Sequence, residues 1–270
     1  MLVDKVAEIL AETAAEVIEP RFRALADGDV SEKAPGELVT VADREAELII
    51  AERLRGLLPV PVVGEEAVSA DPSLVKAVCS EPAVWLVDPL DGTGNFVAGR
   101  PEYAVMAALI KDGETVAAWI WQPTTRLGYT AELGGGAWRN GERLRRAPAG
   151  GGPAALRGVV LSRFMPPDLR TAVDARTGGI GTLAPGSRCS GVEYPRVAEG
   201  DQDFTLFWRT LPWDHAPGSL LVTEAGGVSA RLDGDPYRVG RDVEGLLVAA
   251  DEESWQQVRR ELGLRPVDLA

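Results

Sequence analysis

The fold is decided by the stretch Trp85-Leu86-Val87-Asp88-Pro89-Leu90-Asp91-Gly92-Thr93-Gly94-Asn95-Phe96. Its apolar run, residues 84–87, predicts a short buried strand. That strand ends in two acids, Asp88 and Asp91, inside a turn that carries two glycines. Carboxylates beside a hydrophobic core have to be paired or have to coordinate a metal ion. The stretch therefore predicts a metal site with a phosphate-binding turn next to it.

The segments before this stretch predict its first neighbours in the fold. Residues 2–26 predict a helix, because apolar side chains recur there every three or four positions. Residues 27–37 are polar and rich in turn formers, so they predict a surface loop. A second helix should follow residues 38–43, and residues 61–64 predict a short strand that ends directly before Glu65.

Beyond Phe96 the pattern changes to short apolar runs that are separated by turn residues. We predict an antiparallel meander with strands at residues 103–110, 115–121, 127–132 and 136–139. The pair Asn140-Gly141, which follows the last run, is a strong signal for a type I′ hairpin. Residues 147–156 are rich in Gly, Ala and Pro, and they predict a linker.

Strand and helix patterns alternate after the linker. Strands are predicted at residues 158–162, 204–208 and 243–250, and helices at 167–175, after Gly186-Ser187, at 213–225 and at 251–262. This mixture predicts the α/β (α+β) class. We expect an N-terminal α+β half, residues 1–148, and a C-terminal α/β half, residues 149–270, that together form one compact catalytic unit.

The composition is that of a soluble globular protein, with 45% hydrophobic and 26% charged residues. No apolar run approaches the roughly 20 residues of a membrane span, and the N-terminus does not have the pattern of a signal peptide. Cys79 and Cys189 form neither a disulfide framework nor a zinc-ligand spacing. These features predict a cytoplasmic protein without a membrane partner.

The net charge of −13 bears on the partners of the protein. It argues against non-specific nucleic-acid binding, which depends on Lys and Arg. An anionic substrate would be repelled unless cations were bound in the site. An acidic protein that acts on phosphates therefore implies metal ions.

Four acids stand where predicted strands end or where a helix starts: Glu65, Asp88, Asp91 and Asp214. Oxygen ligands of this kind suit hard cations such as Mg²⁺ or Mn²⁺. His215 is the only histidine, so Ser-His-Asp catalysis and zinc sites built on several histidines are not available. Asp88 and Asp91 are also three positions apart, rather than two as in the Asp-x-Asp-x-Thr motif of aspartyl-phosphate enzymes of the haloacid dehalogenase type.

Each of these residues also has a purely structural interpretation. Asp88-Pro89 and Asp91-Gly92 are ordinary turn sequences, Glu65 can be a surface charge, and Asp214 can cap a helix. His215 is expected to serve in packing or in a local hydrogen bond. The complete string after a buried strand is much rarer by chance than either dipeptide, which favours a functional site there.

Four motifs occur in the order in which one known family carries them. The two signatures are residues 88–96, Asp-Pro-Leu-Asp-Gly-Thr-Gly-Asn-Phe, and residues 213–227, which begin Trp-Asp-His-Ala-Pro-Gly. Residues 38–43 and 64–66 are weaker blocks. With these motifs the chain resembles the inositol monophosphatase family of metal-dependent, lithium-sensitive phosphatases over nearly its whole length. The resemblance implies a layered αβαβα sandwich of the sugar-phosphatase type and a homodimer.

The resemblance also implies a set of metal ligands. Glu65, Asp88 and the Leu90 carbonyl would bind one Mg²⁺, and Asp88, Asp91 and Asp214 would bind a second. A third, weaker ion would depend on Glu65. Mn²⁺ is an alternative ion, and inhibition by Li⁺ is expected.

Three further residues receive catalytic and phosphate-binding roles from the resemblance. Thr93 with Asp43 would orient and deprotonate the attacking water, and the backbone N–H groups of Gly92 and Thr93 would hold the phosphate. Two metal ions about 3.5–4 Å apart can clamp the attacking and leaving oxygens of an in-line displacement. Such a site needs no histidine base.

One departure from the family pattern concerns the substrate. Family members that hydrolyse inositol monophosphate carry a glutamate seven residues before the aspartate of the second signature, and here that position is Phe207. A phenyl ring cannot accept hydrogen bonds from sugar hydroxyls. Arg188 and Ser190 replace the small residues that the family commonly has at the preceding helix. We expect these three residues to select another substrate, with Arg188 either meeting a second anionic group or forming a surface ion pair.

The sequence thus predicts a metal-dependent phosphomonoesterase that hydrolyses a small phosphorylated metabolite by in-line attack of an activated water. Sugar, polyol, histidinol and nucleotide phosphates are the candidates, since relatives in the superfamily act on histidinol phosphate, fructose 1,6-bisphosphate, NADP and nucleotide 3′-phosphates. Inositol-1-monophosphatase activity proper is one alternative. A non-catalytic interaction protein of the same fold is another, and cleavage of a phosphodiester or pyrophosphate by the same metals is a third.

Overall fold

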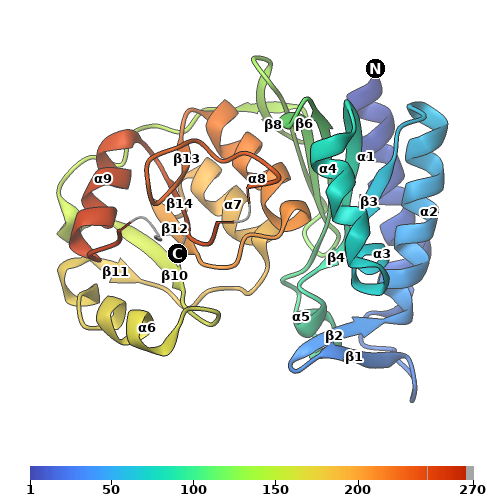
Figure 1. Ribbon diagram of the computed structural model, residues 1–270, viewed down its shortest axis with the longest axis horizontal. Helices are drawn as coiled ribbons and strands as arrows, with labels where there is room; N and C mark the ends of the chain where they lie inside the picture. The colour runs from blue at the N-terminus through green and yellow to red at the C-terminus, as the bar shows by residue number, and fades with distance from the viewer. Residues whose placement is uncertain (242, 266–270) are drawn as a thin grey trace.

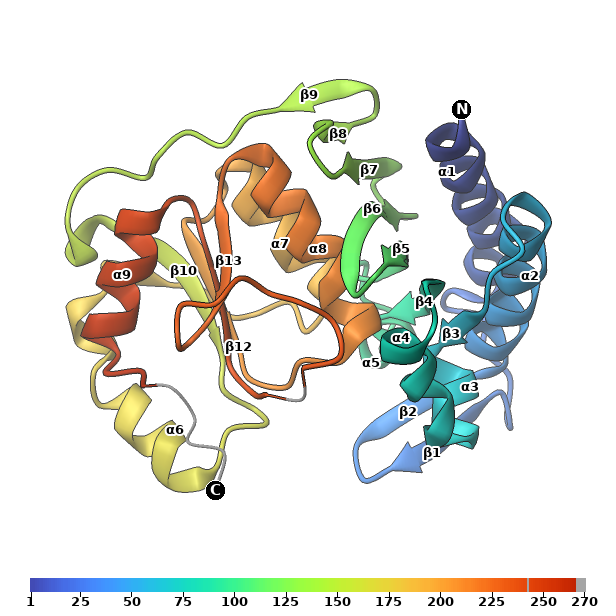
Figure 2. The same cartoon turned by 45° about the horizontal axis from the view of Figure 1, so that its top comes forward.

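The computed structural model describes residues 1–241 and 243–265 of the chain (Figure 1). Two sheets and three pairs of helices form successive layers (Figure 2). The three helix pairs are α1 (Leu2–Thr13) with α2 (Val41–Leu57), α7 (Ser190–Glu199) with α8 (Pro212–Ala225), and α6 (Pro167–Asp174) with α9 (Glu252–Glu261). The α7–α8 pair lies between the sheets, and the other two pairs cover the outer faces. The layered fold predicted from the sequence is confirmed.

The seven-stranded sheet contains the stretch that opened the sequence. Its strand order is β3-β4-β5-β6-β7-β8-β9, with bounds β3 (Val62–Gly64), β4 (Ala83–Asp91), β5 (Ala104–Lys111), β6 (Glu114–Gln122), β7 (Leu127–Glu132), β8 (Gly136–Arg139) and β9 (Glu142–Leu144). Only β3 and β4 run parallel; the rest of the sheet is the predicted antiparallel meander, extended by β9. Strand β4 is buried on both faces, with Trp85 and Val87 packed toward α1 and α2 and with Val84 and Leu86 on the opposite side.

The five-stranded sheet has the order β11-β10-β12-β14-β13. Its strands are β10 (Arg157–Leu161), β11 (Thr182–Leu183), β12 (Phe204–Phe207), β13 (Val228–Arg231) and β14 (Leu246–Ala249). Strand β12 alternates between two cores, because successive side chains of a strand point to opposite faces. Phe204 and Leu206 pack with the side that α9 covers, whereas Phe207 packs toward α7 and α8. Strands β11 and β13 were not predicted.

Two predictions for the first 40 residues need correction. The predicted helix 2–26 is too long: α1 continues as a π-helical turn, η1 (Ala14–Ile18), and a 3-10 turn, η2 (Glu19–Arg21), and the chain is extended at Phe22. The predicted surface loop 27–37 is wrong in part, because β1 (Val30–Ala34) pairs with β2 (Glu37–Thr40) in a hairpin. The sequence pattern does not predict β1, because its side chains are mostly polar. The strand is stabilised by backbone pairing with β2 rather than by an apolar face.

Short helices complete the described part of the chain. They are α3 (Glu65–Ala70), η3 (Pro72–Lys76), α4 (Ala77–Ser80), α5 (Thr93–Val97), η4 (Pro153–Ala155) and η5 (Thr177–Gly179). Residues 147–156, the predicted linker, fall between the last strand of the first sheet and the first strand of the second. The division into halves at residues 148 and 149 stays a prediction. In the described residues, no helix is both long and apolar enough to cross a membrane.

Candidate active site

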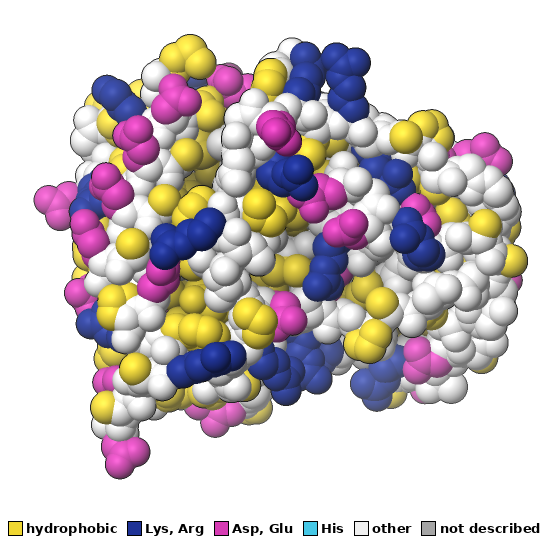
Figure 3. All heavy atoms as spheres, turned by 180° about the vertical axis from the view of Figure 1, so that it is seen from behind, with side chains coloured by type: hydrophobic (Ala, Val, Ile, Leu, Met, Phe, Trp, Pro, Cys, Tyr) yellow, Lys and Arg dark blue, Asp and Glu magenta, His cyan; other side chains and the backbone are white. Residues whose placement is uncertain are grey.

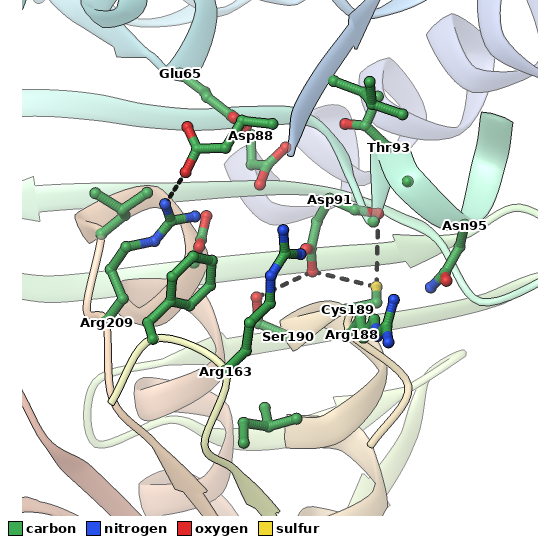
Figure 4. A pocket seen from close by; sticks show the side chains of 18 of the residues that line it. Glu65, Asp88, Asp91, Thr93, Asn95, Arg163, Arg188, Cys189, Ser190 and Arg209 are labelled. Carbon is green, nitrogen blue, oxygen red and sulfur yellow. Dashed lines mark hydrogen bonds and ion pairs between the residues drawn. The ribbon is translucent and has the colours of Figure 1, made fainter. Parts of the chain in front are cut away.

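The predicted acids come together beside a cavity of about 450 Å³ between the two sheets (Figure 4). Glu65 stands at the start of α3, Asp88 lies near the end of β4, and Asp214 lies in the first turn of α8. Each offers a carboxylate oxygen, and these oxygens lie within 4.8 Å of one another. Side chains that are 126 residues apart in the chain, Asp88 and Asp214, thus meet at one point.

An irregularity in β4 allows Asp88 and Asp91 to line the same cavity. Residues three apart in a regular strand point to opposite faces of the sheet. The pairing of β4 with β5 shifts register between Asp88 and Asp91, around Pro89, which has no N–H to donate to the ladder. Bulges of this kind re-aim side chains. Both aspartates consequently border the cavity.

The electrostatics of the cluster fit a bound divalent cation. Burial raises the pKa of Asp88 well above its ordinary value, and the negative charges of Glu65, Asp91 and Asp214 raise it further. Burial likewise raises the pKa of Asp214, with Asp91 and Glu65 adding to the effect. Buried carboxylates that share a site cannot all ionise without a compensating charge. Oxygen ligands at this spacing are the donor set of hard cations such as Mg²⁺.

Asp91 also binds the N-terminal end of α7, the helix that follows β11. Its Oδ2 accepts hydrogen bonds from the backbone N–H of Gly191 at 2.6 Å, from the Ser190 hydroxyl at 3.1 Å and from the Cys189 thiol at 3.2 Å. These donors, together with the position of Asp91 at the first turn of α7, fix the orientation of its carboxylate. Ser190, predicted as a substrate contact, has its hydroxyl on Asp91 and is 8% exposed.

The predicted catalytic pair is in hydrogen-bond contact. The Thr93 hydroxyl lies 2.9 Å from Asp43 Oδ1 and 2.9 Å from the Leu90 carbonyl oxygen. Thr40 holds the other oxygen of Asp43, through its hydroxyl at 2.5 Å and its N–H at 2.8 Å. Burial raises the pKa of Asp43 to about 6, although hydrogen bonds from Thr40 and Thr93 oppose the shift. Asp43 is therefore largely ionised at neutral pH and can accept a proton.

Gly92 supplies the turn that places Thr93. Its φ of +86° lies in the left-handed region, which favours glycine. A Cβ there would lie 2.8 Å from the carbonyl oxygen of Glu102. The short helix α5 then begins at Thr93, and the first N–H groups of a helix have no partner inside the helix.

Two residues that support Glu65 were not among the predicted site residues. Lys33, on the hairpin strand β1, places its ammonium 2.9 Å from Glu65 and 2.5 Å from Glu66. Glu47, 6% exposed on α2, accepts the backbone N–H groups of Glu66 at 2.7 Å and Ala67 at 2.8 Å, so it fixes the start of α3. The sequence carried a signal for Glu47, since it is an acid next to Ala46 on the buried face of a predicted helix.

The two other residues predicted to contact substrate lie in different surroundings. Arg188 is exposed and lines the cavity. Phe207 also borders the cavity, but it is 4% exposed, and its ring stacks on Tyr194 at 4.8 Å and meets His215 edge-on at 4.8 Å. Two residues further along, Arg209 reaches the mouth of the cavity. The predicted site residues did not include Arg209.

His215 has the packing and hydrogen-bonding role that its sequence context favoured. Its Nε2 lies 2.9 Å from the Arg209 carbonyl oxygen, and its Nδ1 lies 2.8 Å from the Tyr194 hydroxyl. Burial lowers the pKa of His215 to about 3, so the ring is neutral. A carbonyl only accepts, so Nε2 carries the proton and donates it to Arg209, and Nδ1 accepts from Tyr194.

Comparisons with known proteins agree with this fold. The family model described as "Inositol monophosphatase family" matches residues 2–262. An inositol-1-monophosphatase of Rhizobium meliloti is 34% identical over 252 residues, which cover 88% of this chain and 87% of that protein. The fructose-1,6-bisphosphatase/inositol-1-monophosphatase of Thermotoga maritima is 32% identical over 202 residues, or 73% of each. The crystal structure of the extragenic suppressor protein suhB from Bartonella henselae has a TM-score of 0.82 at 24% identity and covers 97% of this chain and 98% of its own.

The fold and the site define the class: the protein is a phosphatase, a hydrolase that removes phosphate from small phosphorylated metabolites. The chain belongs to the inositol monophosphatase family. This family is metal-dependent, and the carboxylates at residues 65, 88 and 214 form a cluster that can hold an ion. The family membership predicted from the two signatures is thereby confirmed.

Proposed function

We propose that the protein is a Mg²⁺-dependent phosphomonoesterase with two or three metal ions, for which Mn²⁺ can substitute and which Li⁺ inhibits. One observation carries the proposal: the carboxylate oxygens of Glu65, Asp88 and Asp214 converge within 4.8 Å beside the hydrogen-bonded pair Thr93–Asp43. A non-catalytic interaction protein would not need both arrangements.

The metal ligands that we propose are Glu65, Asp88, Asp91, Asp214 and the carbonyl oxygen of Leu90. The raised pKa values of Asp88 and Asp214 support this assignment, because they reflect negative charge that a cation would balance. When bound, Mg²⁺ polarises the phosphoryl oxygens and lowers the pKa of water.

The remaining chemistry is assigned to residues around the cluster. Thr93 accepts a hydrogen bond from the attacking water and passes its own proton toward Asp43, whose Oδ1 lies 2.9 Å away. Thr40 keeps Asp43 in place through Oδ2. The N–H groups of Gly92 and Thr93 orient the phosphate for in-line attack. No histidine is required, and His215 is already committed to two hydrogen bonds.

Inositol monophosphate is not the substrate that we favour. The buried ring of Phe207, packed on Tyr194 and His215, offers no hydrogen-bond acceptor to sugar hydroxyls. Arg188 offers positive charge instead. The relatives' names include inositol-1-monophosphatase and fructose-1,6-bisphosphatase, so both activities belong in a substrate screen.

The setting that we propose is a cytoplasmic homodimer that binds neither nucleic acids nor membranes. The net charge of −13 supports the exclusion of nucleic acids. Sedimentation equilibrium of the purified protein would decide the oligomeric state.

The proposed function is tested by phosphate release from inositol 1-phosphate, fructose 1,6-bisphosphate, histidinol phosphate and adenosine 3′,5′-bisphosphate. We expect turnover that requires Mg²⁺ and stops with EDTA, and a loss of at least about a hundredfold in Asp91→Asn, on the scale of removing one catalytic electrostatic group. Asp112→Asn, an exposed turn residue, is the matched control. Full activity in Asp91→Asn would refute the two-metal assignment.

A further inference from the structure

A second cavity, of about 430 Å³, lies on the outer face of the seven-stranded sheet. Residues of α1, β6, β7 and β8 line it, and among the described residues none lines both this cavity and the one that the carboxylates border. In Figure 2, α1 lies beside the sheet, and β8 and β9 extend away from it. A twisted sheet separates from a straight helix within a few strands. The cavity fills the space that this divergence leaves.

The floor of the second cavity is a trough along β7. Alternate residues of a strand share one face of the sheet. On this face, Thr130 of β7 lies opposite Trp119 of β6 and opposite Trp138 of β8. Gly128 lies opposite Trp121, and a Cβ on this glycine would be 3.2 Å from the Trp121 ring. A small side chain thus lies between two indoles, and the Trp121 indole closes one end of the trough.

The spacing of the two indole walls suits one aromatic ring. Neighbouring strands are ~4.7–4.9 Å apart, so β6 and β8 lie about 9–10 Å apart on either side of β7. A ring above β7 is half this distance from each flanking strand, which is within the ~4.5–7 Å at which aromatic rings pair. Trp119, the inner wall, is 1% exposed, and Trp138, the outer wall, is 36% exposed. A flat molecule above Thr130 would have an indole on each side.

Both walls are held in place by the protein itself. The indole N–H of Trp119 donates to the Val3 carbonyl oxygen at 2.9 Å, which fastens β6 to the first turn of α1. The Arg143 guanidinium carbon lies 5.6 Å from the centre of the Trp138 ring. Arg143 belongs to β9, so it supports this indole from the edge of the sheet and leaves β7 open. A ligand would meet walls that are already ordered, which lowers the entropic cost of binding.

The rest of the lining is mainly apolar. Val3, Ala7 and Leu10 lie three or four positions apart, so they share the face of α1 that covers the trough. The Thr130 side chain is half-buried, and its hydroxyl has no hydrogen-bond partner within residues 1–241 and 243–265. A hydroxyl can donate or accept. Ligand sites commonly combine apolar walls with a few polar groups of this kind.

The charges around the second cavity disfavour anions. Its only charged side chains among the described residues are Asp4 and Glu132, and both are exposed. Figure 3 shows acidic side chains along the edge that α1 and α2 form, with hydrophobic side chains next to them. Negative potential repels anions such as phosphate esters, while exposed carboxylates attract cations only weakly. The occupant that the lining favours is therefore uncharged.

We propose that the second cavity is a binding site for an uncharged aromatic molecule that carries a polar substituent. The ring lies between Trp119 and Trp138, and the substituent bonds the Thr130 hydroxyl. A small molecule fits this cavity better than a peptide does, because α1 covers the trough. Its volume falls in the range of small-molecule sites, ~300–1,000 Å³. The site is separate from the carboxylate cluster, so this proposal does not depend on the proposed function.

The probe for the test is 2-naphthol, a phenol that is uncharged at neutral pH. The chain has seven tryptophans, whose indole N–H groups give separate signals in ¹⁵N-resolved NMR spectra. We expect 2-naphthol to shift the signals of Trp119, Trp121 and Trp138 until they saturate. Trp208, which lines the carboxylate cavity, and Trp255, in the core of the other sheet, should not shift.

Two analogues separate the features of the ligand. Decahydro-2-naphthol keeps the hydroxyl and loses the aromatic rings, and naphthalene-2-sulfonate keeps the rings and adds a negative charge. From the same signals, we expect both dissociation constants to be at least about fivefold higher than that of 2-naphthol. Equal affinity of either analogue would overturn the proposed ligand class, and the absence of saturable shifts at these three tryptophans would overturn the site.

Variants locate the contacts. Trp138→Ala removes the outer wall and should raise the dissociation constant of 2-naphthol at least about fivefold. Thr130→Val keeps the shape of the side chain without its hydroxyl and should raise it about threefold. Leu48→Ala removes a 72% exposed side chain on α2 and should leave it unchanged. A wild-type dissociation constant in either cavity variant would refute the proposal. Circular dichroism checks that each variant folds, and the analogues test the wild-type protein without any substitution.

Discussion

The hydroxyl of Thr93 lies 2.9 Å from Oδ1 of Asp43 and joins the first turn of α5 to the first turn of α2. Asp43 is also the N3 residue of a capping box, in which it bonds Thr40 through its other oxygen. One carboxylate therefore stabilises a helix start and accepts a hydrogen bond from the Thr93 hydroxyl. The cap thereby fixes the geometry of the proposed catalytic pair.

Replacement of Thr93 by valine should abolish the proposed proton transfer from Thr93 to Asp43, while the size of the side chain stays nearly the same. We expect kcat to fall by about 10²–10⁴, the usual contribution of a positioned acid or base. Thr93→Ser, which keeps the hydroxyl, should retain most of the activity. Steady-state rates of phosphate release with saturating Mg²⁺ measure both variants. A valine variant within twofold of the wild-type kcat would show that Thr93 does not relay a proton.

Charge repulsion in the carboxylate cluster should lower the free energy of unfolding of the metal-free protein. Burial and the negative charges of Asp91 and Glu65 raise the pKa of Asp214. Asp214→Asn removes this buried charge, so we expect its free energy of unfolding in EDTA to exceed that of the wild type. Mg²⁺ at a hundred times its dissociation constant should stabilise the wild type by about 2.7 kcal/mol and the variant by less.

Calorimetric unfolding with EDTA and with Mg²⁺ measures both effects. Asp112→Asn, which alters an exposed aspartate outside the cluster, should behave as the wild type does in each condition. Equal stabilisation of Asp214→Asn and wild type by Mg²⁺ would contradict the assignment of Asp214 as a metal ligand.

Glycine at position 188 should be better tolerated by the fold than arginine. A left-handed backbone costs a non-glycine residue about 1–2 kcal/mol, whereas glycine loses about 0.5–1 kcal/mol through its greater freedom in the unfolded chain. We expect Arg188→Gly to raise the free energy of unfolding by up to about 1 kcal/mol over Arg188→Ala, which keeps the strain. Urea unfolding compares the two variants. A glycine variant less stable than the alanine variant would disprove the strain at this position.

The tyrosines predict how stability depends on alkaline pH. The pKa values of all four tyrosines are raised, mainly by burial: Tyr103, Tyr129, Tyr194 and Tyr237. The pKa of Tyr103 rises to about 12. Since the folded state keeps these protons when the unfolded state loses them near pH 10, this contribution to stability is full below pH 10 and declines as the pH rises toward 12.

Tyrosinate absorbance and circular dichroism should therefore change together in one cooperative transition above pH 10. The protein unfolded in urea should titrate near pH 10, which serves as the control. Ionisation of any tyrosine near pH 10 without loss of the dichroism signal would contradict the burial of that side chain.

Local patterns were enough to predict the strand that carries Asp88 and Asp91. An apolar run followed by acids and glycines has few other interpretations, and the meander followed from similar runs. The layered arrangement of sheets and helices, in contrast, was implied by the resemblance to the family. The hairpin strand at residues 30–34 escaped prediction because Ser31, Glu32 and Lys33 show no apolar alternation. The residue pattern does not show that this strand pairs with β2. It therefore does not show that Lys33 contacts Glu65 either.

The surroundings of the site were harder to predict than its acids. The sequence indicates that Glu47 lies on the buried face of a helix, but it does not reveal that its partners are the backbone N–H groups at the start of α3. Ser190 was expected to contact substrate, yet its hydroxyl lies on Asp91, a relationship between residues 99 positions apart. Arg163 and Arg209 are ordinary loop residues in the sequence, and only the parallel pairing of β10 with β12 brings them to one edge.

The placement of Arg163, Arg188 and Arg209 after β10, β11 and β12, beside the cavity that the carboxylates border, has a consequence for protein engineering. Asp88 and Asp91 belong to the other sheet, whereas Asp214 lies only five residues after Arg209, so the proposed metal ligands are divided between two distant parts of the gene. Randomised libraries limited to the codons after those three strands should yield catalysts with altered substrate preference while the chemistry is preserved.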